Sequence, residues 1–184
     1  HRKDAFPSTF LSPGLSARCG CSSFVMYHHN GRNFMKTIPN DTFFACVEAE
    51  LAEGRPVRFR LKGNSMFPLL RNGKDVVVLE KCSFESLKPM DVVLFRYRGK
   101  HVLHRIIRRE GECLLIQGDG SIVAKEECKV DDVVGKVVQI CRSSGKVLSV
   151  DSWQWRIPSR LWRGLGFLRT WLLRGVHILF LKQV

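Results

Sequence analysis

Short apolar runs separated by turn-forming residues fill residues 55–150, and they constrain the fold more than any other feature. In the clearest run, residues 57–62, Val57, Phe59 and Leu61 alternate with basic side chains. A period of two is typical of a strand buried on one face. Further runs rich in Val, Ile and Leu follow at 75–80, 91–97, 102–108, 112–117, 133–140 and 146–150. This pattern predicts a mainly β domain, an antiparallel and partly closed barrel-like sheet.

Flanking helices are expected on either side of this β domain. Asn40 and Asp41 are typical of a helix start and Gly54 of a helix end, with Val47 and Leu51 at helical spacing between them. This predicts an N-terminal helix within 35–54. Pro and Gly break any periodicity in residues 1–34, which we interpret as a disordered or spurious extension ahead of a functional start near Met35.

The C-terminal segment, residues 151–184, differs in composition from the rest. It holds six Lys and Arg against one acid, whereas residues 35–150 hold twenty against fifteen. With Trp and Leu at helical spacing, this predicts a basic amphipathic helical tail. Such a tail suits an anionic lipid surface better than nucleic acid, for which no recognition motif is present. Terminal helices packed on the sheet remain the alternative, and the longest uncharged run, 175–181, is too short to cross a bilayer.

The cysteines indicate neither a metal site nor a disulfide framework. Seven cysteines occur at irregular spacing, with no Cys-x-x-Cys pair, at positions 19, 21, 46, 82, 113, 128 and 141. We therefore expect buried free thiols, with Cys113 in the core, and no metal or organic cofactor.

Two residues of the β domain can carry chemistry together. Ser65 lies in a loop directly after the run 57–62, and His104 lies in the run 102–108. A serine hydroxyl becomes a nucleophile when a nearby base accepts its proton, and neutral imidazole is such a base. Taken separately, this serine is typical of a turn and this histidine of a structural strand residue. Taken together, they favour a Ser-His peptidase.

Five segments in order resemble the motifs of the signal peptidase I family. That family uses a lysine base in its bacterial type and a histidine base in its endoplasmic-reticulum type, which archaea and some spore-forming bacteria share. The similarity covers roughly residues 55–141 and is to the histidine type. The segments are Gly63-Asn64-Ser65-Met66-Phe67-Pro68-Leu69-Leu70, Met90-Asp91-Val92-Val93-Leu94-Phe95, Val102-Leu103-His104-Arg105-Ile106, Gly118-Asp119-Gly120 and Val133-Val134-Gly135-Lys136-Val137.

The resemblance implies a bacterial serine endopeptidase that cleaves an extended signal or leader peptide after small side chains. Ser65 would attack the scissile carbonyl, and His104 would accept its proton. Asp119 would be needed, for instance to orient the imidazole. From the residues alone, Gly118-Asp119-Gly120 is equally typical of a plain β-turn, and both interpretations stay open.

The loop around the nucleophile has further expected roles. The Ser65 backbone N–H is a natural oxyanion donor, because Gly63 permits close approach of the chain. Asn64, Met66 and Pro68 would shape this loop and wall the cleft.

The substrate is expected to pair with a strand edge near the nucleophile. The runs 57–62 and 91–97 would flank the groove, with Phe59, Leu61 and Phe95 lining it. Lys100 is an alternative general base, which would form a Ser-Lys dyad, but His104 occupies the expected position of the base. His101 is expected to face solvent, and Asp75 to serve in a turn.

Three departures from the family pattern affect these expectations. Met90 stands where the family usually has glycine, so that turn is expected to be altered. The second acidic residue has no clean counterpart, although Lys125, Glu126 and Glu127 lie nearby. The N-terminal membrane anchor typical of secretory signal peptidases is missing, and a C-terminal interfacial helix would replace it.

The expected partners are a precursor or leader peptide and a membrane surface contacted peripherally through residues 153–184, with no nucleic acid. The expected location is a bacterial membrane surface, with the cytoplasm as the alternative. Two other functions stay open. One is a specialised peptide-maturation protease of the same clan, and the other is a catalytically inactive relative that holds a peptide in its groove.

Overall fold

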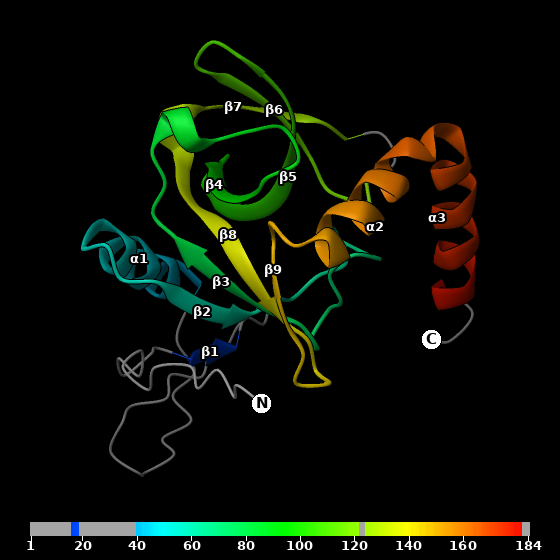
Figure 1. The fold of residues 1–184 in the computed structure, drawn as a ribbon, viewed down its shortest axis with the longest axis horizontal. Coiled ribbons are helices and arrows are strands. Elements are labelled where there is room, and N and C mark those ends of the chain that lie inside the picture. The colour runs from blue at the N-terminus through cyan, green and yellow to red at the C-terminus, as the bar shows by residue number, and fades with distance from the viewer. Residues whose placement is uncertain (1–15, 19–39, 122–123, 182–184) are drawn as a thin grey trace, which may run out of the picture.

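A single curled sheet is the main element of the computed structural model, which describes residues 16–18, 40–121 and 124–181 (Figure 1). The strand order is β1-β2-β3-β8-β4-β5-β6-β7, and β9 pairs with β8. Every pair is antiparallel except β1 with β2. The strands are β1 Ser16–Arg18, β2 Val57–Arg60, β3 Val76–Glu80, β4 Val92–Tyr97, β5 Lys100–Glu110, β6 Cys113–Gln117, β7 Glu126–Lys129, β8 Val133–Cys141 and β9 Val147–Ser149.

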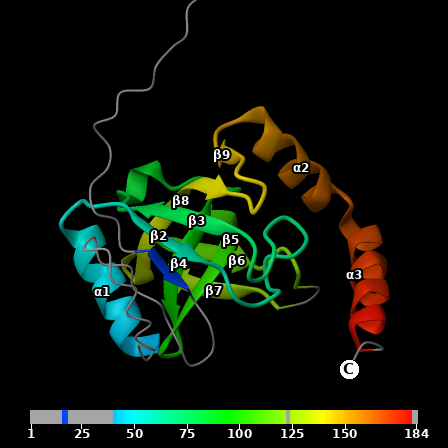
Figure 2. The same ribbon diagram turned by 90° about the horizontal axis from the view of Figure 1, so that it is seen from below.

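Helices flank this sheet on two sides. Helix α1 (Asn40–Ala52) lies on one side, and α2 (Trp153–Gly164) and α3 (Gly166–Leu181) lie on the other (Figures 1 and 2). Two short 3-10 turns, Phe84–Ser86 and Val130–Asp132, connect strands. The predicted mainly β, antiparallel fold with flanking helices is confirmed.

The sheet is open, so the expected barrel-like closure is not observed. Its end strands β1 and β7 do not pair with each other among the described residues. Two bulges in β8 bend the sheet, with Val138 as the extra residue opposite Val78–Leu79 of β3 and Val134 as the extra residue opposite Leu94–Phe95 of β4. The long strand β8 changes partner from β4 to β3 along its length. The bends curl the sheet without bringing its edges together.

Both faces of the central strand β4 are buried. Val92 and Leu94 contribute to a core that also contains the inner face of α1, whereas Val93 and Phe95 contribute to a second core with residues of β5 and β6. This explains why β4 is a continuous apolar run, whereas the half-exposed β2 alternates. The α1 residues in the first core are Phe43, Phe44, Val47 and Leu51.

The predicted elements agree with the structure to within a few residues, with two additions. Strand β7 was not predicted because its sequence, Glu-Glu-Cys-Lys, has no apolar alternation. Within the segment 1–34, Ser16–Arg18 forms β1 beside β2, and the rest of that expectation lies outside the described residues, as does 182–184. In the described part of the chain, no helix has the length and apolar character needed to cross a membrane.

The five described cysteines are free, as expected, but they are not uniformly buried. Cys128 is buried, and Cys46, Cys82 and Cys141 are half-buried. Cys113 is exposed, so its expected place in the core is wrong. Strand alternation explains the error, because the core positions of β6 are Leu114 and Ile116, and Cys113 has the opposite parity.

Candidate active site

The loop after β2 presents Ser65 at the protein surface. Gly63 has φ +99°, in the left-handed region that glycine enters at little cost. Its N–H donates to Asn72 Oδ1 at 3.1 Å, which fixes the start of the loop. Met66 is buried in the first core and anchors the far side of Ser65, whose own side chain is exposed. The loop therefore holds the Ser65 hydroxyl at the surface, next to the buried side chain of Met66.

Asn64 and Pro68 belong to the same turn. The Asn64 carbonyl accepts the Phe67 N–H at 3.0 Å, and Pro68 is half-buried. The Ser65 N–H pairs with no carbonyl or carboxylate of the described residues. It is therefore available to a ligand, as an oxyanion donor must be.

His104 in β5 is held by a carboxylate. Its ring is buried, and its Nδ1 lies 2.9 Å from Oε2 of Glu126 in β7. A carboxylate can only accept, so Nδ1 carries the proton in this contact. In the neutral imidazole, Nε2 then has a free lone pair and can act as a base.

Gly118 lies between the serine loop and the imidazole. A methyl group added at Gly118 would lie 2.5 Å from the Ser65 carbonyl oxygen and 3.0 Å from His104 Nε2. Those two atoms are therefore no farther apart than the sum of these distances. The Gly120 N–H donates to the same Ser65 carbonyl at 2.7 Å. The Ser65 hydroxyl itself makes no hydrogen bond to His104 among the described residues.

Asp119 does not orient His104 in this structure. Its buried carboxylate accepts from Nε and Nη2 of Arg105, the latter at 2.7 Å. His104 and Arg105 are adjacent in β5, so they face opposite sides of the strand and contact different carboxylates. Glu126 is the carboxylate at His104, a residue that the sequence placed nearby without a role. Asp119 instead belongs to a buried ion pair that fixes its loop.

An apolar pocket of about 150 Å³ opens beside Ser65. Phe59 and Leu61 line it as expected, together with Leu94 and Leu103. Phe95 does not line this pocket. It is fully buried in the second core, with its ring 6.2 Å from that of His104, because neighbouring residues of β4 face opposite cores. The expectation for Phe95 as a groove residue is therefore wrong.

His101 closes one wall of the same pocket, where a solvent-facing residue was expected. Its ring stacks on Phe44 with centroids 4.2 Å apart. Its Nε2 lies 2.7 Å from Glu48 Oε1 in α1. The two contacts tie α1 to β5 at the wall of this pocket.

Helices α2 and α3 contact the loop that carries Gly118. Trp162 donates its indole N–H to the Asp119 carbonyl at 2.9 Å. Arg169 donates to the Gly118 carbonyl at 3.1 Å and also to the Ser121 carbonyl. Burial lowers the pKa of the Arg169 guanidinium, which Asp119 partly offsets. The tail, expected to face a membrane or the sheet, thus also supports the loop between Ser65 and His104.

Lys100 and Asp75, the other titratable residues considered above, lie outside the site formed by Ser65 and His104. Lys100 is exposed at the start of β5, and Asp75 is fully buried, accepting from Arg142 at 2.6 Å. Among the described residues, no group of three or more His, Cys, Asp or Glu side chains could hold a metal ion.

The arrangement provides a surface serine, an imidazole whose Nε2 lies near the backbone of the serine loop, and a carboxylate at the other ring nitrogen. These are the parts needed for nucleophilic acyl transfer. No family model matches this chain, and no curated protein matches it, so the resemblance to the signal peptidase I family stays a prediction from the five motifs.

Proposed function

We propose that this chain is a serine endopeptidase of the signal peptidase type, with Ser65 as nucleophile and His104 as general base. One observation carries the proposal. Gly118 has room only for a hydrogen between the Ser65 backbone and His104 Nε2, while Glu126 holds the opposite ring nitrogen. A purely structural histidine needs no such close approach to a surface serine loop.

In the proposed reaction, rotation of the Ser65 side chain brings its hydroxyl to His104 Nε2 as substrate binds. Ser65 Oγ then bonds to the scissile carbonyl carbon, and its proton passes to Nε2. The Ser65 N–H stabilises the oxyanion. The carbon–nitrogen bond breaks, and Nε2 returns the proton to the leaving amine. Water, activated by the same imidazole, hydrolyses the resulting ester.

The substrate of the proposed enzyme is an extended precursor or leader peptide. A pocket of about 150 Å³ lined by Leu61, Leu94 and Leu103 suits a small apolar side chain next to the cut. This supports the preference for small side chains that the family resemblance implies.

Peptide cleavage by matched variants tests the proposal. The substrates are precursor peptides with small residues before the cut. Ser65→Ala and His104→Ala are each expected to lower kcat by at least about 1,000-fold. Ser143→Ala, at an exposed serine outside the site, is the control and should cleave as the wild type does. Equal cleavage by all four proteins would refute the proposal. Peptide binding without turnover by any of them would favour the inactive peptide-holding alternative.

A further inference from the structure

Exposed apolar side chains are concentrated on α2 and α3. In the described part of the chain, eight large hydrophobic residues are at least half exposed, and seven of them belong to these helices. The eighth is Val147 in β9. The seven, called here the apolar face, are Trp153, Ile157, Leu161, Phe167, Leu168, Trp171 and Leu172, with exposed fractions from 50% to 72%.

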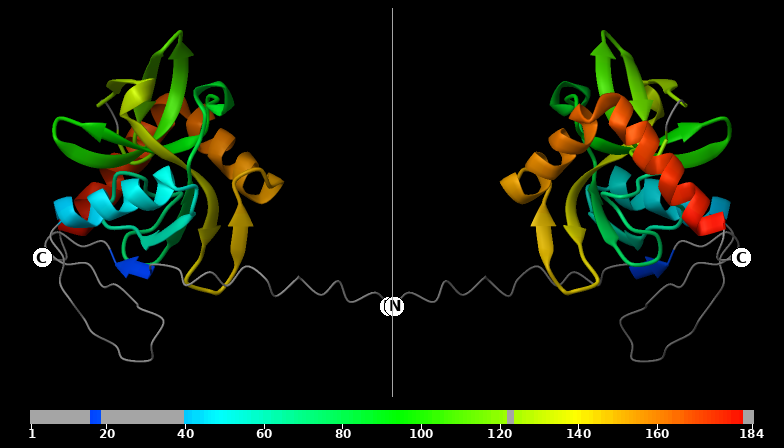
Figure 3. Two further views of the ribbon diagram at one scale, coloured as in Figure 1. Left: turned by 90° about the vertical axis from the view of Figure 1, so that its left-hand side faces the viewer. Right: turned by 90° about the vertical axis from the view of Figure 1, so that its right-hand side faces the viewer.

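The members of the apolar face share one side of each helix, opposite the side that packs on the domain. In α2 its members recur every four residues, whereas Trp155 and Ser159 are buried on the other side. In α3 its members recur as two adjacent pairs four residues apart, whereas Arg169 and Leu173 are buried. Both helices are therefore held by one side and leave an apolar side exposed. Figure 3 shows the course of the two helices, coloured orange to red, beside the sheet.

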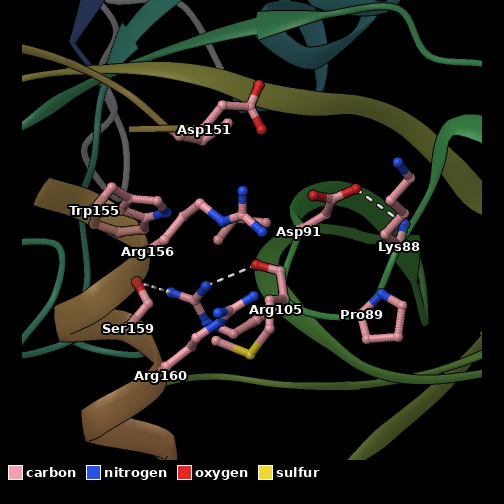
Figure 4. Close-up of a pocket in the computed structure, with 12 residues that line it drawn as sticks. Lys88, Pro89, Asp91, Arg105, Asp151, Trp155, Arg156, Ser159 and Arg160 are labelled. Atoms are coloured by element: carbon pink, nitrogen blue, oxygen red, sulfur yellow. Dashed lines mark hydrogen bonds between the residues drawn. The ribbon is translucent and has the colours of Figure 1, made fainter. Parts of the chain in front are cut away.

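Basic side chains border this face. Arg156 and Arg160 line a pocket of about 170 Å³ with Lys88, at the edge of α2 (Figure 4). Neither arginine side chain has a hydrogen bond or ion pair with the rest of the described chain. Two acids, Asp91 and Asp151, line the same pocket, and Asp91 is paired with Lys136 at 3.6 Å. After Asp151 the sequence has no acidic residue at all.

We propose that the apolar face, with Arg156 and Arg160, docks this protein onto an anionic lipid bilayer. Apolar side chains enter the interface between head groups and acyl chains, and guanidinium groups bind lipid phosphates. Charge complementarity selects this occupant over a second copy of the chain. Two copies would each bring a net charge of +13 to the contact, from helices that have no acidic residue after Asp151. Docking would place the neighbouring active-site loop at the membrane surface.

Intrinsic fluorescence reports this docking without a label, because all four tryptophans lie in α2 and α3. The full chain is mixed with vesicles of phosphatidylcholine or of phosphatidylcholine with phosphatidylglycerol, and flotation measures the bound fraction. We expect a blue shift and flotation with phosphatidylglycerol vesicles, both weakened by salt. Trp153→Phe with Trp171→Phe should remove the shift while retaining flotation.

Two double variants test the two parts of the surface. Leu161→Ser with Phe167→Ser should weaken vesicle binding by at least about tenfold, and Val147→Ser is its matched control. Arg156→Gln with Arg160→Gln should weaken binding to phosphatidylglycerol vesicles by about tenfold. Lys74→Gln with Lys146→Gln, which removes two exposed charges from turns outside the tail, should change it less than twofold.

Failure of flotation with phosphatidylglycerol vesicles, or flotation unchanged in both test variants, would overturn the proposal. So would a dimer in solution that Leu161→Ser with Phe167→Ser dissociates, because that result assigns the face to a second copy. The measurement needs no substrate, and Ser65→Ala should float like the wild type. The membrane proposal and the peptidase proposal can therefore fail separately.

Discussion

Glu126 and Glu127 are neighbours in β7 and provide a matched test of the carboxylate behind His104. Glu126 contacts Nδ1, whereas Glu127 points to solvent. We expect Glu126→Gln to lower kcat by about 100-fold or more, with little change in KM, because an amide can no longer stabilise the imidazolium that forms during attack. Glu127→Gln should be silent. Peptide-cleavage kinetics of both variants check this, and similar kcat values would rule out a role for Glu126.

Gly118 tests the close approach between the serine loop and His104. An added methyl would lie 2.5 Å from a backbone oxygen that cannot rotate away, so Gly118→Ala must displace one of the two loops. We expect loss of most activity, about 100-fold. Gly164→Ala is the control, because a methyl group there meets nothing within 4 Å. Full activity of Gly118→Ala, with thermal unfolding unchanged, would show that the approach is unimportant.

At this scale, the sequence is informative about which residues matter and less so about what each contacts. Ser65 and His104 could be chosen because a loop and a strand present them within recognisable motifs. The carboxylate that contacts His104 could not be predicted from the sequence, because His104 and Arg105 are adjacent yet face opposite sides of β5. Asp119 therefore accepts a hydrogen bond from Arg105 and not from His104. Glu126 lies in β7, a strand that the sequence does not predict because it has no apolar alternation.

Among the elements, α3 does more than cover a surface. Arg169 reaches from α3 to the carbonyls of Gly118 and Ser121. We expect Arg169→Ala to lower kcat by about tenfold or more with KM nearly unchanged, because the loop between Ser65 and His104 loses its support. Arg169→Lys should restore part of the loss by supplying one donor.

Arg174→Ala is the matched control for that prediction, since Arg174 is an exposed arginine of the same helix. Near-ultraviolet circular dichroism should show all three variants folded. A change in KM alone, or equal effects of Arg169→Ala and Arg174→Ala, would contradict a positioning role for Arg169.

The strands and the first helix were predictable because hydrophobic period is a strong local signal. The turn before β4 shows a finer effect. Met90, where the family usually has glycine, has φ +82°, a conformation that glycine adopts without steric cost. The contacts that the inward side of α2 and α3 makes with the loop at Gly118 could not be predicted from the sequence. An amphipathic pattern shows that one side is apolar, but not that Trp162 and Arg169 on the other side bind the loop that carries Gly118.

For the whole molecule, burial of the Cys128 thiol in the second core makes stability sensitive to pH. Burial raises the pKa of Cys128 from the ordinary 9.0 to about 12. In the unfolded chain this thiol ionises near 9, so the unfolded state binds fewer protons than the folded state between these values. Its contribution to stability is therefore fully present below pH 9 and declines as pH rises toward 12, by at most about 1.4 kcal/mol per pH unit.

Urea unfolding of the wild type and of Cys128→Val between pH 8 and pH 11 measures this contribution. We expect the free energy of unfolding to fall more steeply with pH in the wild type, because the variant has no thiol at this site. Cys113→Ala, which removes an exposed thiol, should follow the wild-type slope. Identical slopes for the wild type and Cys128→Val would contradict the raised pKa.

Closure is the large-scale property that the sequence could not supply. Strand number, turns and alternation are local, whereas closure depends on whether the edges β1 and β7 meet after the bends at the two bulges of β8. The placement of Ser65 beside His104 is also non-local, yet it was predictable because the motif order implied it. Fold class and the proximity of the Ser65 loop to His104 follow from patterns along the chain, and curvature and loop support do not.

Trapping of an acyl-enzyme is a direct test of the proposal that Ser65 is a nucleophile activated by His104. The protein is mixed with the p-nitrophenyl ester of N-acetyl-alanine, quenched with acid and analysed by intact-mass and peptide mass spectrometry. The account predicts a burst of p-nitrophenol and an N-acetyl-alanyl group on Ser65, which is absent in Ser65→Ala and strongly reduced in His104→Ala. Acylation of another residue, or equal labelling of Ser65 in the His104→Ala protein, would contradict it.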